Sequence, residues 1–324
     1  MKIGIVGNEM IVRQMLQDMK KLPDFVAVSI CVREKSLEKG RVLAEEFGIM
    51  DVDTDYEEFL KRADMDTVYI GIVNQMHFDY ARQALEMGKH VICEKTFTGT
   101  ARESKLLAEL ARKKGLFLWE AFKIPYSPVF QAVKNHLEEI GTVKLVQCNY
   151  SRVSSRYRQY ETGVVLPVFD PAYGGGCLHD INLYNLHFVT GLFGKPERVH
   201  YYANHGFNGV DTSGTVILEY GDFLGVCSGA KDSSSPCFAV VQGTKGWIRV
   251  EGPASAAVKA ELVVEGEHRI LAEDMEHGTL TRELREFARQ LREKDWSACQ
   301  KMLNHSIMMM EVLEEAAVSD AVSV

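Results

Sequence analysis

A glutamate and a lysine stand side by side directly after a short apolar run. The run comprises residues 91–93, and Glu94 and Lys95 follow it. If the run is a strand of a parallel sheet, the pair lies at the carboxyl edge of that sheet, where open α/β sheets bind their ligands. Burial can bring the pKa of a lysine close to neutral pH, where its amine can exchange a proton. The pair therefore marks a candidate active site, and the alternative interpretation is a surface salt bridge, which contributes little to stability.

A second candidate group follows a run of glycines in the second half of the chain. Residues 174–176 are all glycine, and the segment after them is predicted to be a helix that carries Asp180 and Tyr184. Residues four apart share one face of a helix. A carboxylate and a phenol on one face can orient a hydroxylated substrate and exchange a proton with it. The alternative is a partly buried helix whose polar edge is satisfied by its neighbours.

Two polar side chains follow another predicted strand, at residues 67–73. Asn74 and His77 fall at the same sheet edge as Glu94 and Lys95. Asn74 can hydrogen-bond a ribose or a carboxamide. His77 opens the next helix, where a lone histidine is more often a capping or packing residue than a catalyst. Both are candidates for cofactor binding.

An arginine follows the second predicted strand, at residues 25–32. NAD-preferring folds usually place an acid at this strand tip for the ribose hydroxyls, whereas Arg33 can offer its guanidinium to a 2′-phosphate. Arg33 therefore favours NADP, although Glu34 leaves NAD open. The alternative is a solvated charge cluster that opens a helix.

The first predicted βα turn matches a dinucleotide-binding fingerprint only in part. In the pattern G-x-G-x-x-G/A, Gly7 fits, whereas Glu9 and Val12 occupy the second and third positions. A carboxylate about 4 Å from a phosphate would cost a few kcal/mol at an effective dielectric of about 20. Glu9 can avoid this cost by pointing outward, or it can itself stabilise the start of the helix. Asn8 and Met10 complete this candidate cofactor loop, and the alternative is a turn that binds no nucleotide.

The elements that must position these groups differ between the two parts of the chain. Up to residue 122, short apolar strands alternate with amphipathic helices, which predicts a Rossmann-type, doubly wound parallel sheet in an N-terminal dinucleotide-binding domain at residues 1–122. From residue 123 to 324, longer β-like runs and glycine-rich turns predict a C-terminal α+β domain with a large, mostly antiparallel open sheet. We assign substrate binding and oligomerisation to this second domain. We interpret the basic, aromatic segment 150–160 as a solvated loop, and the alternative is a cleft-covering loop that meets substrate or the partner subunit.

Composition and charge exclude several classes of protein. A chain of 324 residues exceeds one small core, and its net charge of −8 disfavours nucleic acid or an anionic membrane as the main partner. Seven cysteines without a C-x-x-C pair argue against a disulfide framework and a zinc site, and they favour a reducing, cytoplasmic compartment. No signal peptide, no transmembrane run and no metal site are expected.

Residues 1 to about 150 resemble the glucose–fructose oxidoreductase/inositol dehydrogenase (Gfo/Idh/MocA) family. The segments that carry the resemblance are 69–77, 84–95 and 119–122. The family's Glu-Lys-Pro motif stands here with Thr96 in place of the proline, and the proline of its Pro-Asn pair is Val73.

The second half of the chain supplies an independent resemblance to the same family. The segment 173–184 resembles the family's Gly-Gly-Gly-x-Leu-x-Asp-x-Gly-x-Tyr segment, with Asn182 in place of the last glycine. Its final residue, Tyr184, resembles the dihydrodiol dehydrogenase and glucose–fructose oxidoreductase branches, because the inositol dehydrogenase branch has a histidine there.

The resemblance implies an NADP(H)-dependent oxidoreductase, with NAD as the alternative cofactor, that transfers a hydride between the nicotinamide and a hydroxyl or carbonyl of a polyol, sugar or dihydrodiol. Lys95 would bind the reacting oxygen, and Tyr184 would exchange the proton, with its pKa lowered by Lys95. Asp180 would orient substrate hydroxyls or Lys95. Which of Lys95 and Tyr184 is the formal acid stays open. The residues expected to bind the cofactor are Gly7, Asn8, Glu9, Met10, Arg33, Asn74, His77, Glu94, Lys95 and Glu120.

A different class of function is also compatible with these residues. A sugar-binding or regulatory homologue that has lost its cofactor would explain Glu9 and Thr96. The presence of Lys95, Asp180 and Tyr184 argues against it, because a sensor does not need a proton-transfer set. In either class the expected ligand is a small polyol or sugar, and the resemblance implies a homodimer or tetramer formed through the C-terminal sheet.

Overall fold

In a computed structural model, which describes residues 1–323 and side chains up to residue 320, the chain divides into two units. The first unit comprises Met1–Phe122 and Thr279–Met310, and the second comprises Lys123–Gly278 and Glu311–Val324. Residues 279–310, which the sequence analysis placed in the C-terminal domain, therefore pack with the first unit.

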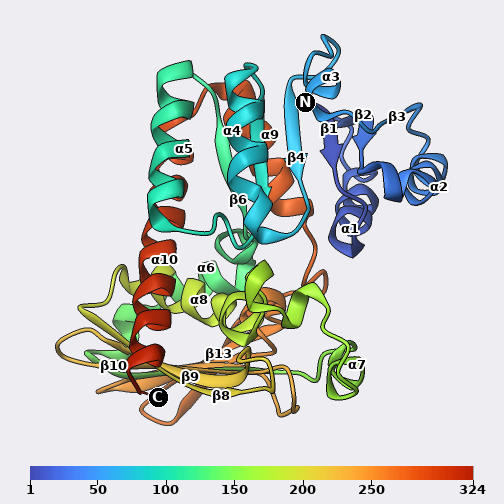
Figure 1. Cartoon of the computed structure of the whole chain (residues 1–324). Helices are drawn as coiled ribbons and strands as arrows, with labels where there is room; N and C mark the ends of the chain where they lie inside the picture. The colour runs from blue at the N-terminus through green and yellow to red at the C-terminus, as the bar shows by residue number, and fades with distance from the viewer. Residues whose placement is uncertain (324) are drawn as a thin grey trace. The chain divides into compact units, whose positions relative to one another are not determined.

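Six parallel strands form the sheet of the first unit, in the order β3-β2-β1-β4-β5-β6 (Figure 1). The direction of winding reverses between β1 and β4, as in a doubly wound sheet, so the predicted fold class is confirmed for this unit. The sequence analysis missed β3, which has only three residues and no apolar alternation. The strands are β1 (Lys2–Val6), β2 (Val26–Cys31), β3 (Asp51–Asp53), β4 (Thr67–Ile70), β5 (His90–Glu94) and β6 (Leu118–Ala121).

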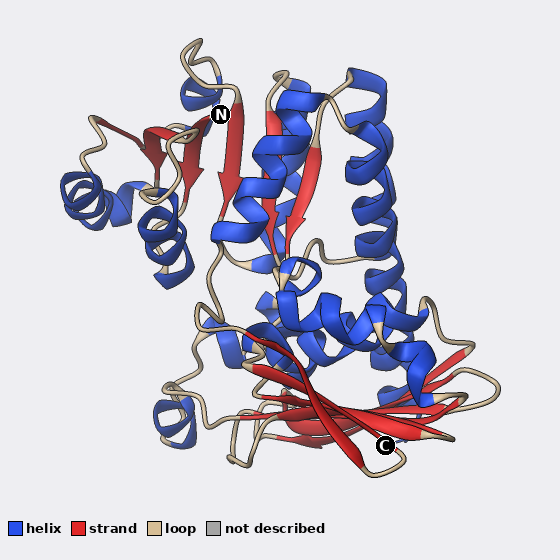
Figure 2. Cartoon of the chain, turned by 180° about the vertical axis from the view of Figure 1, so that it is seen from behind, coloured by secondary structure: helices blue, strands red, loops and turns tan. Residues whose placement is uncertain are grey.

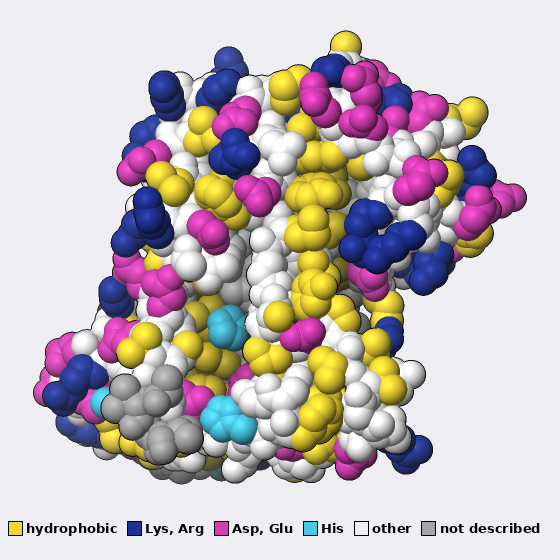
Figure 3. Space-filling model, in the orientation of Figure 1, with side chains coloured by type: hydrophobic (Ala, Val, Ile, Leu, Met, Phe, Trp, Pro, Cys, Tyr) yellow, Lys and Arg dark blue, Asp and Glu magenta, His cyan; other side chains and the backbone are white. Residues whose placement is uncertain are grey.

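Amphipathic helices connect these strands. The sequence marks their ends clearly: α5 begins with a capping box between Thr100 and Glu103 and ends at Gly115, which adopts a left-handed conformation. Acidic and basic side chains are interspersed over the helices of this unit (Figure 3). The helices are α1 (Met10–Met19), α2 (Leu37–Phe47), α3 (Tyr56–Leu60), α4 (His77–Glu86), α5 (Ala101–Lys114), α9 (Thr281–Glu293) and the first part of α10 (Trp296–Ser323).

Helices α9 and α10 join the first unit through aromatic contacts with β6. The indole of Trp119 donates a hydrogen bond of 2.7 Å to Gln290 and packs against Phe287, with ring centroids 5.2 Å apart. Phe117 stacks on Trp296 with centroids 3.8 Å apart. Aromatic pairs of this kind contribute beyond the apolar area that they bury, which explains why residues distant in sequence complete this core.

Eight strands form the sheet of the second unit, in the order β14-β13-β12-β11-β7-β10-β9-β8 (Figure 2). All neighbouring strands are antiparallel except β7 and β10, so the predicted mostly antiparallel sheet is confirmed. The analysis missed β14, whose residues are mostly exposed and lack a regular apolar pattern. The strands are β7 (Val143–Ser151), β8 (Arg198–His205), β9 (Asp211–Glu219), β10 (Leu224–Ala230), β11 (Phe238–Gly243), β12 (Gly246–Glu251), β13 (Lys259–Val264) and β14 (Glu267–Glu273).

Helices of the second unit contact this sheet, with α6 (Pro128–Asn135) on β13 and β14, and α8 (Leu183–Phe193) on β7 and β10. The end of α10 binds β8, where the Val199 backbone N–H donates to Glu315 and the Tyr201 N–H donates to Ser319. None of the described helices is long and apolar enough to span a membrane.

The segment after β7, interpreted from the sequence as a solvated loop, is mostly exposed up to residue 159, but it carries secondary structure and reaches a small core at its end. It forms helix α7 (Tyr157–Glu161) and a 3₁₀ turn at Pro167–Phe169. Tyr160 and Phe169 are buried and stack with ring centroids 4.8 Å apart, in a small core with Val210. Aromatic side chains, which the sequence analysis regarded as part of a solvated segment, thus give this segment a core of its own. We call residues 152–173 the flap.

Candidate functional site

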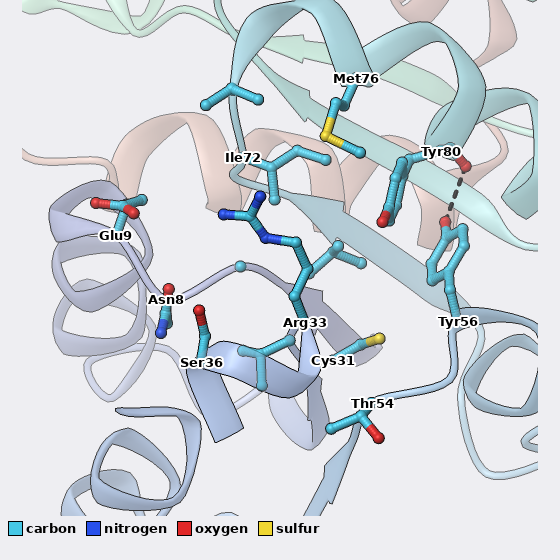
Figure 4. Close-up of a pocket in the computed structure, with 14 residues that line it drawn as sticks. Asn8, Glu9, Cys31, Arg33, Ser36, Thr54, Tyr56, Ile72, Met76 and Tyr80 are labelled. Carbon is cyan, nitrogen blue, oxygen red and sulfur yellow. Dashed lines mark hydrogen bonds between the residues drawn. The ribbon is translucent and has the colours of Figure 1, made fainter. Parts of the chain in front are cut away.

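A pocket opens in the first unit where the sheet reverses its winding (Figure 4). It is formed by the carboxyl ends of β1 and β2, the segment after β4 and the starts of helices α1, α3 and α4. Ligands of open α/β sheets bind at this position. The lining residues are Val6, Gly7, Asn8, Glu9, Cys31, Val32, Arg33, Ser36, Thr54, Tyr56, Ile72, Val73, Met76 and Tyr80.

Gly7 brings the first turn against the neighbouring strand segment. Its φ of +110° is a conformation that residues with a side chain rarely adopt. A Cβ atom at this position would lie 2.2 Å from the carbonyl oxygen of Gly71, which is a severe clash. Only glycine therefore allows this approach of backbone to backbone.

The start of helix α1 offers hydrogen-bond donors to the pocket. Glu9 is the N-cap residue, but its exposed side chain makes no capping hydrogen bond to the residues that the structure describes. Glu9 lines the pocket, and its side chain is exposed to solvent. The amide nitrogen of Asn8 is buried and lacks a hydrogen-bond partner among the described residues. A buried donor without a partner is costly, so a ligand with acceptor oxygens would complete this corner.

The opposite part of the pocket combines a cation with aromatic rings. Figure 4 shows the side chain of Arg33 reaching from the tip of β2 toward Ile72, and Ser36 and Tyr80 line the same pocket. The hydroxyl of Tyr56 donates to the Tyr80 carbonyl oxygen at 2.8 Å, and the two rings lie 4.4 Å apart. An arginine, a hydroxyl and a ring fit a phosphorylated ribose and a planar base. Together with the donors at α1, these residues fit an adenine dinucleotide.

The end of β5 is held by buried polar contacts. Glu94 is buried and accepts a hydrogen bond from the hydroxyl of Tyr69 on β4. Lys95 follows, half-buried, and the peptide bond between Lys95 and Thr96 is cis. The hydrogen bond of Glu94 thus lies within the first unit. Among the described residues, neither Glu94 nor Lys95 lines the pocket.

His77 supports the segment that carries Lys95. Its ring is fully buried, with Nδ1 2.8 Å from the Thr96 carbonyl oxygen and Nε2 3.1 Å from that of Ile72. Burial lowers the pKa of His77. The structure therefore places this residue as a packing histidine, which was the alternative to cofactor contact.

Glu120 lies beside this segment on β6, where its neighbour in register is Cys93 of β5. The side chain is buried, and its residue is 4% exposed. Burial raises the pKa of Glu120 to about 7, the Glu94 carboxylate acts in the same direction, and a hydrogen bond with Ser306 acts against it. The carboxyl therefore changes protonation close to neutral pH.

The second unit presents Asp180 and Tyr184 from an irregular helix. Leu178–Asn182 form a π-helical turn, and α8 begins directly after it, so the helix predicted after the glycines is present and begins with a π-helical turn. Such turns are frequent at functional sites. Asn182, in the place of the family's glycine, donates from Nδ2 to the Cys227 carbonyl oxygen at 2.9 Å and so ties the turn to β10.

The preceding glycines allow this turn to approach the carboxylate of Asp211 closely. Gly176 has a φ of +118°, and a Cβ there would lie 1.9 Å from a carboxylate oxygen of Asp211. That carboxylate accepts hydrogen bonds from the Leu178 backbone N–H at 2.6 Å and the Tyr201 hydroxyl at 2.7 Å. The start of the π-helical turn is thereby anchored to β8 and β9.

Asp180 pairs with a lysine that the sequence analysis did not consider. The Nζ atom of Lys231, which follows β10, lies 2.9 Å from Oδ2 of Asp180. Tyr184 is half-buried, and its ring centroid lies 6.1 Å from that of Tyr150. No local pattern marks Lys231, because its importance comes from a partner about fifty residues away.

The structure thus sorts the predicted cofactor residues into three groups. The pocket is lined by Gly7, Asn8, Glu9 and Arg33, whereas Met10 is 80% exposed at the start of α1. The remaining candidates belong to the sheet edge at β4, β5 and β6 and are absent from the pocket lining among the described residues: Asn74, His77, Glu94, Lys95 and Glu120. Sequence reasoning missed Ser36, Tyr56 and Tyr80, whose only local signal is that each stands near the start of a predicted helix.

Two family models match the chain. One, described as "Oxidoreductase family, NAD-binding Rossmann fold", matches residues 1–122. The other, described as "GFO/IDH/MocA C-terminal domain", matches residues 130–249. The two matches fall in the two parts of the chain on which the sequence resemblance was based.

Proteins of known activity are also similar to the chain. It is 33% identical over 250 residues to the scyllo-inositol 2-dehydrogenase (NADP(+)) of Bacillus subtilis, covering 77% of this chain and 76% of that protein. It is 30% identical over 274 residues to the trans-1,2-dihydrobenzene-1,2-diol dehydrogenase of Xenopus tropicalis, covering 82% of this chain and 78% of that protein.

Solved structures share the fold. A 3-ketoreductase from Actinomadura kijaniata, in complex with NADP and TDP-benzene, has a TM-score of 0.83 at 20% identity, covering 98% of this chain and 97% of that one. A levoglucosan dehydrogenase in complex with NADH and L-sorbose has a TM-score of 0.84 at 17% identity, covering 99% and 96%. At these identities the likeness concerns the fold alone.

Proposed function

Because the chain belongs to the Gfo/Idh/MocA oxidoreductase family and is an NAD(P)-dependent oxidoreductase acting on CH–OH groups, we propose that it uses NADP(H) to interconvert a hydroxyl and a carbonyl on a cyclic polyol or diol. The names of the two relatives supply the substrate class, since scyllo-inositol and the dihydrobenzenediol are both six-membered rings with vicinal hydroxyls. Membership of an enzyme family weighs against the alternative of a cofactor-deficient binding protein.

The observation that carries the choice of NADP is the position of Arg33. It lines the pocket at the tip of β2, where an acid would bind the ribose hydroxyls of NAD. Ser36 lines the same part of the pocket and adds a hydroxyl for a phosphate oxygen. Glu9 is the one carboxylate among the described residues that line the pocket, and it is exposed, so its repulsion of a phosphate is screened by water and salt.

The proposed chemistry assigns one role to each candidate side chain. The bound nicotinamide would accept or donate the hydride. The ammonium of Lys95 would stabilise negative charge on the reacting oxygen, and the phenol of Tyr184 would exchange the proton with it. Asp180 would accept hydrogen bonds from neighbouring hydroxyls of the substrate. His77 would act only through the Thr96 carbonyl oxygen, by positioning Lys95.

A homodimer or tetramer formed through the sheet of the second unit completes the proposal. Alternate residues of β11 and β12 line an apolar depression on this sheet, formed by Phe238, Val240 and Trp247 with Gln242 and Arg249. A contiguous apolar patch of this kind favours an interface between copies of the chain. We also place the protein in the cytoplasm, because all seven cysteines, which lie in the described part of the chain, are free thiols.

The experiment that tests the function combines binding with turnover. Titration by fluorescence or calorimetry with NADPH and NADH measures the two affinities. Reduction of NADP+, followed at 340 nm, is then measured with scyllo-inositol and with trans-1,2-dihydrobenzene-1,2-diol. We expect tighter binding of NADPH than of NADH, and turnover of at least one of the two alcohols. Failure of both dinucleotides to bind at millimolar concentration would contradict the proposed enzyme.

A further inference from the structure

We propose that Lys231 is a positioning residue of the substrate site, which holds Asp180 in place and links it to the flap. The inference rests on the proposed function, in which Asp180 binds substrate hydroxyls. Lys231 follows β10 and belongs to the second unit, as do Asp180 and the flap. All the contacts used below therefore lie within one unit.

The first observation is the burial of Lys231. The residue is 1% exposed and ranks among the large side chains that are fully buried. A lysine is almost never fully buried unless it is paired, because removing an ammonium from water is expensive. The backbone also fixes the residue, since its N–H donates to the Thr212 carbonyl oxygen and its own carbonyl accepts from the Ser154 N–H, each at 2.8 Å. Lys231 is therefore placed by the fold, and its charge needs partners.

Three groups surround the ammonium. Its Nζ atom is 2.9 Å from Oδ2 of Asp180, donates to the Val168 carbonyl oxygen at 2.5 Å, and lies 4.4 Å from the ring centroid of Phe169. One charge thus joins the π-helical turn to the 3₁₀ turn of the flap. Phe169 in turn packs on Tyr160, so the contact reaches the small core of the flap.

Neighbouring acids are engaged by neutral donors. Asp232 accepts from the Thr212 and Ser233 hydroxyls at 2.7 and 2.9 Å. Asp211, on the other side, accepts from Leu178 and Tyr201 as described above. Of these three carboxylates, Asp180 is the one that forms an ion pair with Lys231.

Two further titratable groups belong to this surrounding. Burial raises the pKa of the Cys177 thiol, whose electrostatic neighbours are Asp211, Lys231, Asp232 and Asp180. Burial lowers the pKa of His179. Both changes favour the neutral form near pH 7, so the thiol and the imidazole contribute little charge beside Asp180.

The geometry leaves Asp180 able to act on a substrate. The side chain of Asp180 is 35% exposed, whereas that of Lys231 is 2% exposed. The ammonium therefore fixes the carboxylate from the protein side and leaves part of it accessible. Without Lys231, Asp180 would rotate more freely, and this weakens its hydrogen bonds to hydroxyls.

A double-mutant cycle tests whether Lys231 acts through Asp180. The variants are Lys231→Met, Asp180→Asn and the double substitution. The matched control is Lys144→Met, because Lys144 is an exposed residue of β7. We expect K231M to lower kcat/KM with the best alcohol by about 10- to 100-fold, as misplacement of a positioning group does. The double variant should be no less active than D180N, K144M should match the wild type, and the affinity for NADPH should stay within about twofold in every variant.

The cycle also separates a positioning role from a role in folding alone. The double variant carries no charge at either position, so it removes the cost of leaving one buried ion without its partner. If circular dichroism shows that K231M is unfolded, the activities of D180N and of the double variant are compared instead. Equal activity of these two supports the inference, and a further loss in the double variant contradicts it. Where the variants fold, the losses from K231M and D180N are expected to be non-additive, which a role in folding alone would not produce.

Limited digestion with trypsin tests the link to the flap without any measurement of activity. The flap carries exposed Arg156 and Arg158 at α7. We expect faster cleavage there in K231M than in D180N, because D180N retains the ammonium that binds Val168 and Phe169. Equal cleavage rates in the two variants would contradict the link.

The failure of this inference can be distinguished from the failure of the proposed function. A wild-type protein that turns over neither alcohol contradicts the proposed function. Additive losses of activity in an active protein contradict this inference alone.

Discussion

Arg33 is the side chain on which the choice between two dinucleotides depends. It stands at a strand tip where an acidic residue would repel the 2′-phosphate of NADP, whereas an arginine attracts it. The residues around it, Ser36 and Tyr80, suit a phosphate oxygen and a planar ring. Because the preference resides in one exposed residue, it is open to a direct test.

Replacing Arg33 with Asp should weaken NADPH by at least about 30-fold and NADH by less than about threefold. The reason is the loss of a charge-assisted bond to phosphate and its replacement by repulsion. Calorimetric titration measures both affinities. Lys39→Asp on α2 has the same change of charge at an exposed position and should change both affinities little. An equal effect of R33D on the two dinucleotides would refute the role of Arg33.

Replacing Lys95 with Met should reduce kcat by about 10²-fold or more and leave the affinity for NADPH mostly intact. The ammonium is assigned to charge that develops on the reacting oxygen, and removing one such donor typically has an effect of this size. Steady-state kinetics with scyllo-inositol and calorimetry with NADPH provide the measurements. Lys113→Met on exposed α5 is the control. Undiminished turnover in K95M would overturn the assignment.

At the scale of elements, strand β6 places a carboxyl group where water does not reach it. Glu120 alternates with Trp119 and Ala121 along the strand, and all four residues of β6 are buried. The strand is covered by α9 and α10, which return to the first unit from the end of the chain. The burial of Glu120 is thus a consequence of how distant elements pack.

The stability of the protein should report this burial. The pKa of Glu120 is raised from 4.5 to about 7 in the folded protein, so the carboxyl keeps its proton at pH values where it ionises in the unfolded chain. The stability that the protonated group contributes is therefore fully present below about pH 4.5 and is lost as the pH rises through 7. Relative to the wild type, Glu120→Gln should gain about 2 kcal/mol in the free energy of unfolding between pH 5 and pH 8. Urea denaturation at both pH values measures this difference, and Glu109→Gln on exposed α5 should show none. A constant difference for E120Q would mean that Glu120 ionises normally.

At the scale of the whole molecule, the sheet of the second unit presents apolar side chains on one face. Along β11, Ala239 and Val241 are buried, whereas Phe238 and Val240 alternate with them and remain half-buried. The buried set packs within the unit, and the alternate set lines the apolar depression with Trp247. The period of two in a strand therefore provides both a core and a second surface from one short segment.

Replacing Val240 with Asp should separate an oligomer into chains of 36.4 kDa. A charge in the middle of an apolar interface must be desolvated without a partner, which typically costs several kcal/mol. Light scattering coupled to size-exclusion chromatography measures the mass. Met275→Asp introduces the same charge at an exposed position outside the sheet and should leave the mass unchanged. A wild-type protein that is monomeric would contradict the proposed assembly.

The chain alone was sufficient for the features that depend on local pattern or on residue type. Alternating strands and helices predicted the doubly wound sheet, and longer β-like runs predicted the antiparallel sheet. The motif around Glu94 and Lys95 and the segment ending in Tyr184 identified the family. Gly7 and Arg33 were found because a turn and a strand tip constrain residue type within a few positions.

Only the tertiary structure decided which side chains meet. His77 was assigned to the cofactor, but the fold gives its ring to two backbone carbonyls. Glu94 accepts a hydrogen bond from the hydroxyl of Tyr69. Residues 279–310 pack with the first unit, although they are distant from it in the sequence. Lys231 and Asp180, which are 51 positions apart in the sequence, are joined by the approach of β10 to a π-helical turn. Periodicity and motifs record short-range constraints, whereas pairing across a core depends on the packing of whole elements, and this is why the partner of Asp180 was not visible in the sequence.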